Sequence, residues 1–326
     1  MTGLIALIFV VAIVSSGRKK EEGPSLKITN LNDKYRDLKN SVLQTLMDKK
    51  EFKSYSKEQA KDNKKDKKSA KVVVPKPKLF VLNFDGDIRA SEVETMREEV
   101  TAVLAVAQPQ DEVLMRLDNS GGIVHEHGLA ASQLQRIKDA NLKFTISVDK
   151  VAASGGYMMA CVADKIIAAP FAILGSIGVL AQLPNFHRLL DKVGVDWEQH
   201  TAGEYKRTVT MFGENSDKER EKLKLELQET HVLFRDFVSE NRSKLNIDKV
   251  STGEHWYGKK ALELDLVDEL ITSDEYLIKA LDEFEIYEVA MEVKQKFQDK
   301  LFGGLFSSLQ KARNGLADVA HNSQYK

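Results

Sequence analysis

Short apolar runs alternate with longer stretches of helical spacing from Lys78 onward. The apolar runs predict buried strands over residues 79–84, 112–117, 144–148 and 165–169. Amphipathic spacing predicts helices over residues 91–107 and 127–140, and a further helix that begins at Ser154. Strands that alternate with helices in this way are typical of an α/β core whose sheet is largely parallel.

Helix signals add detail to this pattern. The helix over residues 91–107 is expected to begin with a capping box, because Glu94 stands three residues after Ser91. A charge-rich stretch over residues 215–244 carries one apolar stripe and predicts a long helix with a single buried side. The apolar positions of that stripe are Leu223, Leu227, Leu233, Phe234 and Phe237. Residues 256–268 predict a short helix that leads into a strand.

The N-terminus carries an uninterrupted apolar run from Gly3 to Val14, followed by the basic residues 18–20. A cleaved signal peptide has its positive charges before the apolar run, whereas here they follow it. We therefore expect an uncleaved membrane anchor over residues 1–17, although a full span needs about 20 residues. A buried or interfacial helix is the alternative. The positive-inside tendency places residues 18–20 in the cytoplasm, which leaves the orientation open.

A linker is expected between this anchor and the folded region. Residues 26–47 have helical spacing, but residues 48–71 are rich in lysine and hold too few apolar residues to order themselves. The lysine-rich part predicts a solvated spacer, with contact to anionic lipid as a second possibility. The predicted division of the chain is an anchor at 1–17, a helical and lysine-rich linker at 18–74, a catalytic domain at 75–290 and an amphipathic C-terminal tail at 291–326.

Composition narrows the classes of function. The chain has 326 residues, of which 42% are hydrophobic and 30% charged, with a formal net charge of -1. This charge gives no reason to expect a nucleic-acid partner. The single cysteine, Cys161, excludes an internal disulfide and a multi-cysteine metal site, and its apolar neighbours indicate a buried position.

Two glycine pairs follow predicted strands. Gly121 and Gly122 come after the second strand, and Gly155 and Gly156 come after the third. Active sites of parallel α/β sheets favour the carboxyl ends of strands. Glycines there can turn backbone amides toward a substrate carbonyl, as an oxyanion site requires. A tight turn without a function is the alternative.

Ser154 is the candidate nucleophile. It stands among small residues at the start of a predicted helix, where backbone amides without partners surround it. A serine hydroxyl becomes a nucleophile only when a base removes its proton and a fixed geometry aims it. Taken alone, a serine before two glycines is equally compatible with an N-cap.

Lys206 is the candidate base. A lysine amine accepts a proton at neutral pH only when an apolar pocket favours its neutral form. Lys206 follows Gly203 in a loop-like segment, which allows burial without requiring it. Ser176, in another glycine-rich segment, is expected to hydrogen-bond the amine and orient it. A solvated lysine and a plain serine turn are the alternatives.

Histidines offer a rival base and a possible metal site. His187 and His200 follow Ser154 in the sequence, but neither has a glycine-rich setting. His125 and His127 flank Glu126 and make a metal site conceivable. The helical His-Glu-x-x-His spacing of zinc peptidases is absent, so no metal is expected.

Taken together, the motifs resemble the signal peptide peptidase A family, and most closely its branch with a single catalytic unit. The motifs that carry this resemblance are Asp-Asn-Ser-Gly-Gly at 118–122, Ala-Ser-Gly-Gly-Tyr at 153–157, Leu-Gly-Ser-Ile-Gly-Val at 174–179, Gly-Glu-Tyr-Lys at 203–206, and the segment 256–268. The ordered set is specific and covers residues 26–290.

The resemblance implies an α/β fold of the ClpP/crotonase-like superfold. It also implies that Ser154 is the nucleophile, that Lys206 is the general base, and that Ser176 positions this lysine. The amides near Gly121, Gly122 and Gly155 would form the oxyanion site. No metal or organic cofactor is implied, and family members assemble into ring-like oligomers. One departure concerns Ser120, where the family often has a proline that stiffens the double-glycine loop.

The leading interpretation is a serine endopeptidase that is tethered to the bacterial inner membrane by a single N-terminal anchor. Its partners would be a peptide or protein substrate, the membrane, and further copies of the chain. The family suggests a periplasmic catalytic domain and a role in the turnover of signal peptides or membrane proteins. The alternatives are a catalytically silent membrane scaffold and a crotonase-like acyl-thioester enzyme, which shares the paired amides but does not need a serine and a lysine.

Overall fold

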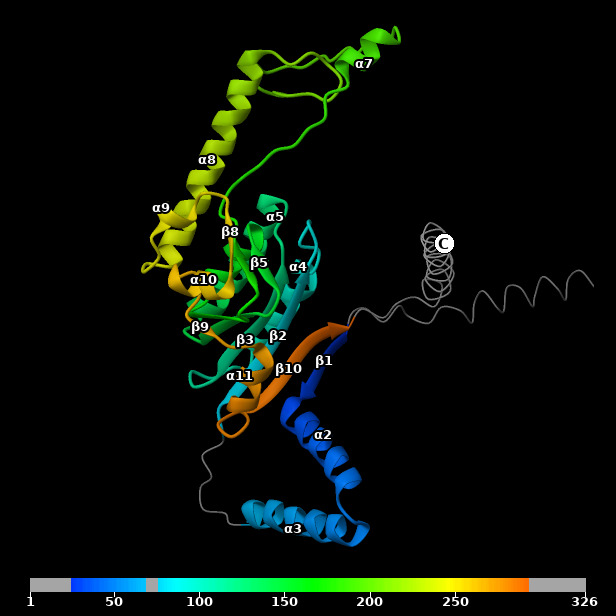
Figure 1. The fold of residues 1–326 in the computed structure, drawn as a ribbon, viewed down its shortest axis with the longest axis vertical. Coiled ribbons are helices and arrows are strands. Elements are labelled where there is room, and N and C mark those ends of the chain that lie inside the picture. The colour runs from blue at the N-terminus through cyan, green and yellow to red at the C-terminus, as the bar shows by residue number, and fades with distance from the viewer. Residues whose placement is uncertain (1–24, 69–75, 293–326) are drawn as a thin grey trace, which may run out of the picture. The chain divides into compact units, whose positions relative to one another are not determined.

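The computed structural model describes residues 25–68 and 76–292 (Figure 1). Its strands are β1 Ser25–Asn30, β2 Lys78–Gly86, β3 Glu112–Asn119, β4 Lys143–Val148, β5 Val151–Ala153, β6 Lys165–Ala168, β7 Ile173–Gly175, β8 His255–Tyr257, β9 Glu269–Leu270 and β10 Glu285–Glu292. Its helices are α2 Leu31–Leu46, α3 Lys49–Lys68, α4 Val93–Leu104, α5 Val124–Asp139, α6 Gly155–Ala160, α7 His187–Lys192, α8 Asp217–Asn241, α9 Ile247–Val250, α10 Gly258–Glu263 and α11 Ser273–Ala280.

Residues 28–290 form one compact unit. A second unit combines the two chain ends, and its described residues are 25–27 and 291–292. Within that second unit, Lys27 and Glu292 form an ion pair with an N–O distance of 2.6 Å. All sites discussed below lie in the first unit.

The sheet confirms the predicted α/β class. Its main path runs β1-β10-β2-β3-β4-β6-β9. The pairs of β2 with β10, β2 with β3, β3 with β4, and β4 with β6 are all parallel, as the alternation of strands and helices predicted. Three short strands branch from this path: β5 pairs with β3 and β7, and β7 pairs antiparallel with β8. This branch brings the end of β3 beside the segment that carries Ser154.

The sheet is covered on both faces. The larger hydrophobic core joins alternate residues of β2, β3 and β4, such as Phe84, Leu117 and Val148, to buried side chains of α4, α5 and α6. A smaller cluster on the other face joins Leu31 of α2 and Leu277 of α11 to the intervening strand residues. The long apolar runs of the strands therefore fit a sheet that is buried on both faces.

Several predicted helices are confirmed with shifted ends, and one predicted cap is wrong. Helix α4 begins at Val93, and no side chain caps it. The hydroxyl of Ser91 instead donates to the Asp87 carboxylate at 2.9 Å, so Ser91 belongs to the preceding turn. Helix α8 begins with a capping box that we did not predict, formed by Ser216 and Glu219.

The region before the catalytic core departs from expectation. Residues 25–30 form strand β1 rather than the start of a helix, and Leu31 is the buried residue of α2. The lysine-rich segment, expected to lack order, forms helix α3 over residues 49–68. Lysine, glutamate and glutamine are good helix formers, so such a segment can be helical without a buried face.

The predicted anchor at 1–17 and nearly all of the tail at 291–326 lie outside the described residues. Among residues 25–68 and 76–292, no helix has both the length and the apolarity that crossing a membrane would require.

Helix α6 follows Ser154 directly and is anchored deep in the core. All six of its residues are buried, and the Tyr157 hydroxyl donates to the Leu266 carbonyl at 2.9 Å. Cys161, at its C-terminal end, is buried as predicted, and its thiol contacts the Met158 carbonyl at 3.2 Å. Burial raises the pKa of the Cys161 thiol to about 12, so this cysteine is inert in the folded protein.

An ion pair ties α8 to the loop before β9. Both guanidinium NH groups of Arg242 donate to Asp268 at 2.9 Å, and Asp268 also accepts from the backbone N–H of Ile166 at 2.7 Å. Burial of Asp268 opposes its ionisation. The hydrogen bonds from Arg242 and Ile166 outweigh burial and hold the pKa of Asp268 below its ordinary value.

We expect Asp268→Asn to lower the free energy of unfolding by about 3 kcal/mol at pH 7, because Arg242 would stay buried without its carboxylate. Since the folded-state pKa of Asp268 lies below the unfolded one, the stabilisation is present at neutral pH and is lost as the pH falls below about 4. Urea unfolding of both proteins at pH 7 and pH 3 measures this. The exposed pair Lys260–Glu263 is the control, and Glu263→Gln should cost less than about 0.5 kcal/mol. If the difference in free energy of unfolding between wild type and Asp268→Asn is as large at pH 3 as at pH 7, the assignment is wrong.

Candidate active site

Ser154 occupies a strained turn between β5 and α6. Its backbone has φ 52° and ψ -119°, a region that residues with a side chain rarely adopt. The backbone N–H of Ser154 donates to the Gly175 carbonyl at 2.8 Å, which fixes the turn against β7. The hydroxyl does not cap α6 and has no other hydrogen-bond partner among the described residues. The N-cap interpretation is therefore wrong, and the hydroxyl stays available.

The double-glycine loop lies directly against this turn. Gly121 has φ +87° and Gly122 φ +159°. A side-chain carbon added at Gly121 would lie 2.7 Å from the backbone nitrogen of Gly155 and 2.7 Å from the Ser154 Cβ. Glycine is needed here for both its positive φ and this close approach. The structure thus brings Gly121 and Gly155 together beside Ser154.

Ser154 opens into a cavity of about 740 Å³. The lining residues come from the double-glycine loop, the start of α5, the end of β7 and helix α8. They include Gly121, Gly122, Val124, Ser154, Ser176 and His231. A cavity of this size can hold several residues of an extended peptide.

Ser176 shares this cavity with Ser154 and also has a positive φ of 52°. Its backbone N–H donates to the Glu254 carbonyl at 2.6 Å, and its hydroxyl lies 3.5 Å from the Gly253 carbonyl. Ser176 is therefore held by the loop before β8, with its side chain facing the space around Ser154.

Lys206 does not line this cavity. It is exposed in the segment of residues 179–215 between β7 and α8, which we call the arm. The neighbouring Glu204 accepts a hydrogen bond from Lys218 at 2.6 Å, and this bond lowers the pKa of Glu204 below its ordinary value. The ammonium groups of Lys218 and Lys222 lie 5.7 and 5.6 Å from the centre of the Tyr205 ring. These contacts hold the Lys206 segment at the N-terminal end of α8.

Two contacts along helix α8 show that Lys206 lies far from Ser154. Lys218 binds the Lys206 segment, whereas His231 of the same helix lines the Ser154 cavity. These two positions are separated by about 20 Å along a helix. In this conformation the two predicted catalytic side chains are apart, while Ser154, Ser176, Gly121 and Gly155 are together.

His231 is a candidate that sequence reasoning missed. It lines the Ser154 cavity, and its ring atom Nε2 is buried without a hydrogen-bond partner. It lies four residues after Leu227 and three before Phe234, so it falls on the apolar stripe predicted for this helix. The same stripe contains Leu223 and continues to the buried Val238, whereas Leu233, assigned to the stripe from sequence, is exposed.

The histidines considered from sequence lie elsewhere. His187 begins α7, and His200 is exposed and contacts Glu198 at 3.3 Å; neither lines the Ser154 cavity. His127 is fully buried inside α5. Within residues 25–68 and 76–292, no cluster of histidine, cysteine or carboxylate side chains could hold a metal ion.

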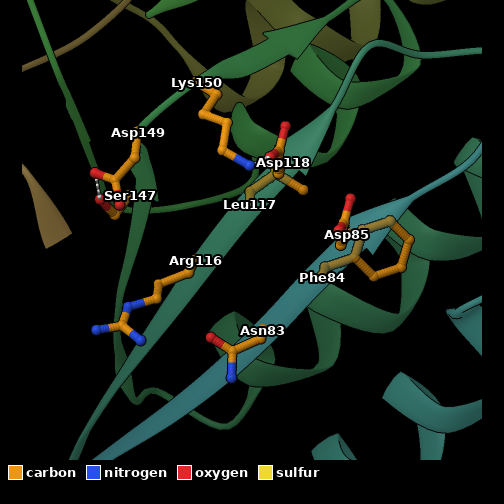
Figure 2. Close-up of a pocket in the computed structure, with 9 residues that line it drawn as sticks. All are labelled: Asn83, Phe84, Asp85, Arg116, Leu117, Asp118, Ser147, Asp149 and Lys150. Carbon is orange, nitrogen blue, oxygen red and sulfur yellow. Dashed lines mark hydrogen bonds and ion pairs between the residues drawn. The ribbon is translucent and has the colours of Figure 1, made fainter. Parts of the chain in front are cut away.

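A second polar cleft lies over the carboxyl ends of β2, β3 and β4 (Figure 2). Lys150 forms an ion pair with Asp118 at 2.6 Å, and Arg116 forms one with Asp274 at 3.2 Å. Because side chains alternate along a strand, Asp118 points away from the face that carries Asn119 and the double-glycine loop. This cleft of about 210 Å³ is therefore separate from the Ser154 cavity.

A small apolar recess adjoins the Ser154 cavity and shares Gly122, Val124, Ser154, Gly178 and Val179 with it. Its lining includes Met158 and Phe234 together with Gly155. A recess of this kind can accept one small apolar side chain of a peptide held beside Ser154.

The sequence matches peptidase family S49 over residues 136–286 and the N-terminal region of peptidase family S49 over residues 1–134. It is 56% identical over 222 residues to the probable protease SohB of Haemophilus influenzae, an alignment that covers 68% of this chain and 63% of that protein. It is 48% identical over 284 residues to the probable protease SohB of Buchnera aphidicola subsp. Schlechtendalia chinensis, which covers 84% of this chain and 93% of the relative.

Among solved structures, the chain is similar to a mutant of the 1510-N membrane-bound stomatin-specific protease in complex with a substrate peptide. The identity is 15%, the match covers 71% of this chain and 98% of that one, and the TM-score is 0.43. The sequence matches are far stronger, and the two family models together cover residues 1–134 and 136–286. The chain therefore belongs to peptidase family S49 and is a SohB-like protease of that family.

Proposed function

We propose that this chain is a serine endopeptidase in which Ser154 attacks the peptide bond and Lys206 acts as general base. The observation that carries the proposal is the unpartnered Ser154 hydroxyl, which is held in a strained turn beside Gly121 and Gly155 and lines a large cavity. Strain of this kind persists only where the surrounding structure enforces it, and it is concentrated at functional sites.

The reaction would proceed in two steps. The neutral amine of Lys206 takes the proton of the Ser154 hydroxyl while the oxygen bonds to the substrate carbonyl carbon. The carbonyl oxygen gains the electron pair and accepts hydrogen bonds from amides near Gly121, Gly122 and Gly155. The ammonium then protonates the leaving nitrogen, the C–N bond breaks, and an ester on Ser154 remains. Water attacks that ester with the same amine as base, which releases the acid and restores the hydroxyl.

This mechanism requires Lys206 to reach Ser154. Either the arm folds over the cavity, or a second copy of the chain supplies its own Lys206. The arm exposes several large apolar side chains, including Leu180, Leu183, Leu189 and Trp197. Exposed apolar groups of this number favour burial against another surface. They support the proposed homo-oligomer, and Ser176 would then orient the incoming amine.

The finer fold assignment and the setting in the cell are also proposals. We infer the ClpP/crotonase-like superfold from the parallel sheet and its short branch at β5 and β7. Residues 1–17 would anchor the protein in the bacterial inner membrane by a single pass. Signal peptides or membrane proteins are then the proposed substrates, with a periplasmic catalytic domain as the family expectation.

The apolar recess beside Ser154 leads to a prediction about substrates. Peptides with alanine before the scissile bond should be cleaved faster than those with leucine, because Met158 and Phe234 leave space for a small side chain. Met158→Ala should enlarge the recess and raise the preference for leucine over alanine about 10-fold, the scale of a methylene in an apolar pocket. The ratio of kcat/KM values on a matched pair of peptides measures this. An unchanged ratio would mean that the recess does not bind that side chain.

Two assays separate the proposal from its alternatives. A fluorophosphonate probe should label the wild type at Ser154, as mapped by mass spectrometry. A catalytically silent scaffold would not be labelled at all. Peptide and acyl-thioester substrates should be compared in parallel, since a crotonase-like enzyme would consume the thioester and leave the peptide intact.

A further inference from the structure

The side chain of Asn119 stands behind the proposed oxyanion site. Asn119 is the last residue of β3 and is almost fully buried. Its Oδ1 atom accepts a hydrogen bond from the backbone N–H of Gly121 at 2.6 Å. The same oxygen lies 3.1 Å from the ring atom Nε2 of His127. A single buried oxygen therefore joins the double-glycine loop to helix α5.

His127 is held from its other side as well. Its Nδ1 atom lies 2.9 Å from the Ile123 carbonyl, so both ring nitrogens lie within hydrogen-bond distance of oxygen acceptors. The ring has no solvent exposure. A neutral imidazole has one N–H, so the ring donates to Asn119 in one tautomer and to Ile123 in the other. Its complete burial leaves it little freedom to move, and the tautomer protonated at Nε2 fixes the Asn119 amide in turn.

The same two residues contact the segment that follows Ser154. A side-chain carbon at Gly155 would lie 2.4 Å from the Cγ atom of His127. One at Gly156 would lie 2.1 Å from the backbone oxygen of Asn119. The His127 ring thus packs directly on the Gly155 backbone, while Asn119 holds Gly121. Both backbone segments of the proposed oxyanion site rest on this one pair.

The loop needs such a restraint. Two consecutive glycines have wide conformational freedom. Ser120 precedes them, at the position where the resembled family often has the fixed φ of proline. Without that ring, the conformation of the loop depends on the hydrogen bond that the Gly121 N–H donates to Asn119.

We propose that Asn119 and His127 are positioning residues that hold the double-glycine loop and the Gly155 backbone in place, so that the Gly122 and Gly155 amides face the oxyanion formed on Ser154. The Gly121 N–H donates to Asn119 and takes no direct part. This inference rests on the proposed function, since it assumes that Ser154 is the nucleophile. The pair touches neither substrate nor the reacting atoms, so its effect is on kcat rather than on binding. A displacement of catalytic groups by about 1 Å is known to cost up to about 100-fold in rate.

Two substitutions of His127 separate positioning from plain packing. Glutamine can place an amide nitrogen near the position of Nε2 and keep the hydrogen bond to Asn119. Asparagine can reach only toward the Nδ1 position and the Ile123 carbonyl. In the full-length protein in detergent, with a peptidyl-coumarin substrate, His127→Gln should keep kcat within about 3-fold of wild type. His127→Asn should lower kcat about 10- to 100-fold with little change in KM.

A second pair at Asn119 tests the same bond from its other end. Asn119→Asp keeps an oxygen for the Gly121 N–H and should retain more activity than Asn119→Ala, which removes it. Urea unfolding of all four variants shows whether kcat follows stability. Equal kcat in the glutamine and asparagine variants, or kcat losses that only track unfolding, would overturn the positioning role.

The assay also distinguishes failure of this inference from failure of the proposed function. If Ser154→Ala keeps its turnover, the nucleophile assignment is wrong. If Ser154→Ala is inactive while all His127 and Asn119 variants retain the kcat of wild type, the nucleophile stands and the positioning role is wrong.

Discussion

Ser154→Ala should lower kcat for a peptide substrate by about 10⁴-fold or more, the scale at which loss of a serine nucleophile acts. The variant should fold as the wild type does. Alanine keeps the Cβ and meets the same backbone strain at φ 52°, and the missing hydroxyl has no hydrogen-bond partner to leave behind. The free energy of unfolding should therefore change by less than about 0.5 kcal/mol. Turnover and urea unfolding, measured on the same preparation, separate a chemical loss from a folding loss.

Ser132 provides a matched control for this experiment. It is an exposed serine of α5 whose hydroxyl donates to the Gly128 carbonyl at 2.8 Å. Ser132→Ala should keep both turnover and labelling by the fluorophosphonate probe. If Ser154→Ala is labelled as strongly as wild type, another residue is the nucleophile.

Lys206→Ala should lower kcat on the order of 10³-fold, within the range known for loss of a general base. Since Lys206 is exposed in the arm, its removal should leave the stability of the core unchanged. Lys192→Ala, at an exposed lysine of α7 in the same arm, should keep full activity. The measurement is single-turnover and steady-state kinetics on one peptide substrate for the three proteins.

His231→Ala decides between the two candidate bases. Because His231 already lines the Ser154 cavity, full activity of Lys206→Ala together with inactivity of His231→Ala would transfer the role of base to the histidine. Mixing subunits then tests how Lys206 arrives. If each chain uses its own lysine, a mixture of Ser154→Ala and Lys206→Ala proteins stays inactive. Activity that appears on mixing shows that a neighbouring copy supplies the lysine.

The fold could be predicted from sequence where the local signal is strong. Each of the strands β2, β3, β4 and β6 contains a short, mainly apolar run, and each was found within about two residues of its ends. Strands β5 and β7 have three residues each, too few for any periodicity to show. Helix α3 was missed because its order comes from helix propensity rather than from an apolar face.

The candidate site shows a similar division. Ser154, Gly121 and Gly155 could be grouped because the carboxyl ends of neighbouring parallel strands meet at one edge of a sheet. The setting of Lys206 could not be predicted, since a loop sequence does not record which surface the loop covers. Asn119 and His127 escaped notice for a related reason: their pairing depends on how α5 packs against the end of β3.

Because Cys161 is buried, its reaction with a thiol reagent reports local opening of the protein core. Cys161 is the only cysteine of the chain, and it ends the helix that follows Ser154. A thiol reagent can therefore modify the folded protein only after the core around α6 has opened. The rate of modification reads out that opening directly, without an engineered label. A variant whose Cys161 thiol is modified at the wild-type rate therefore retains the packing of α6 behind Ser154.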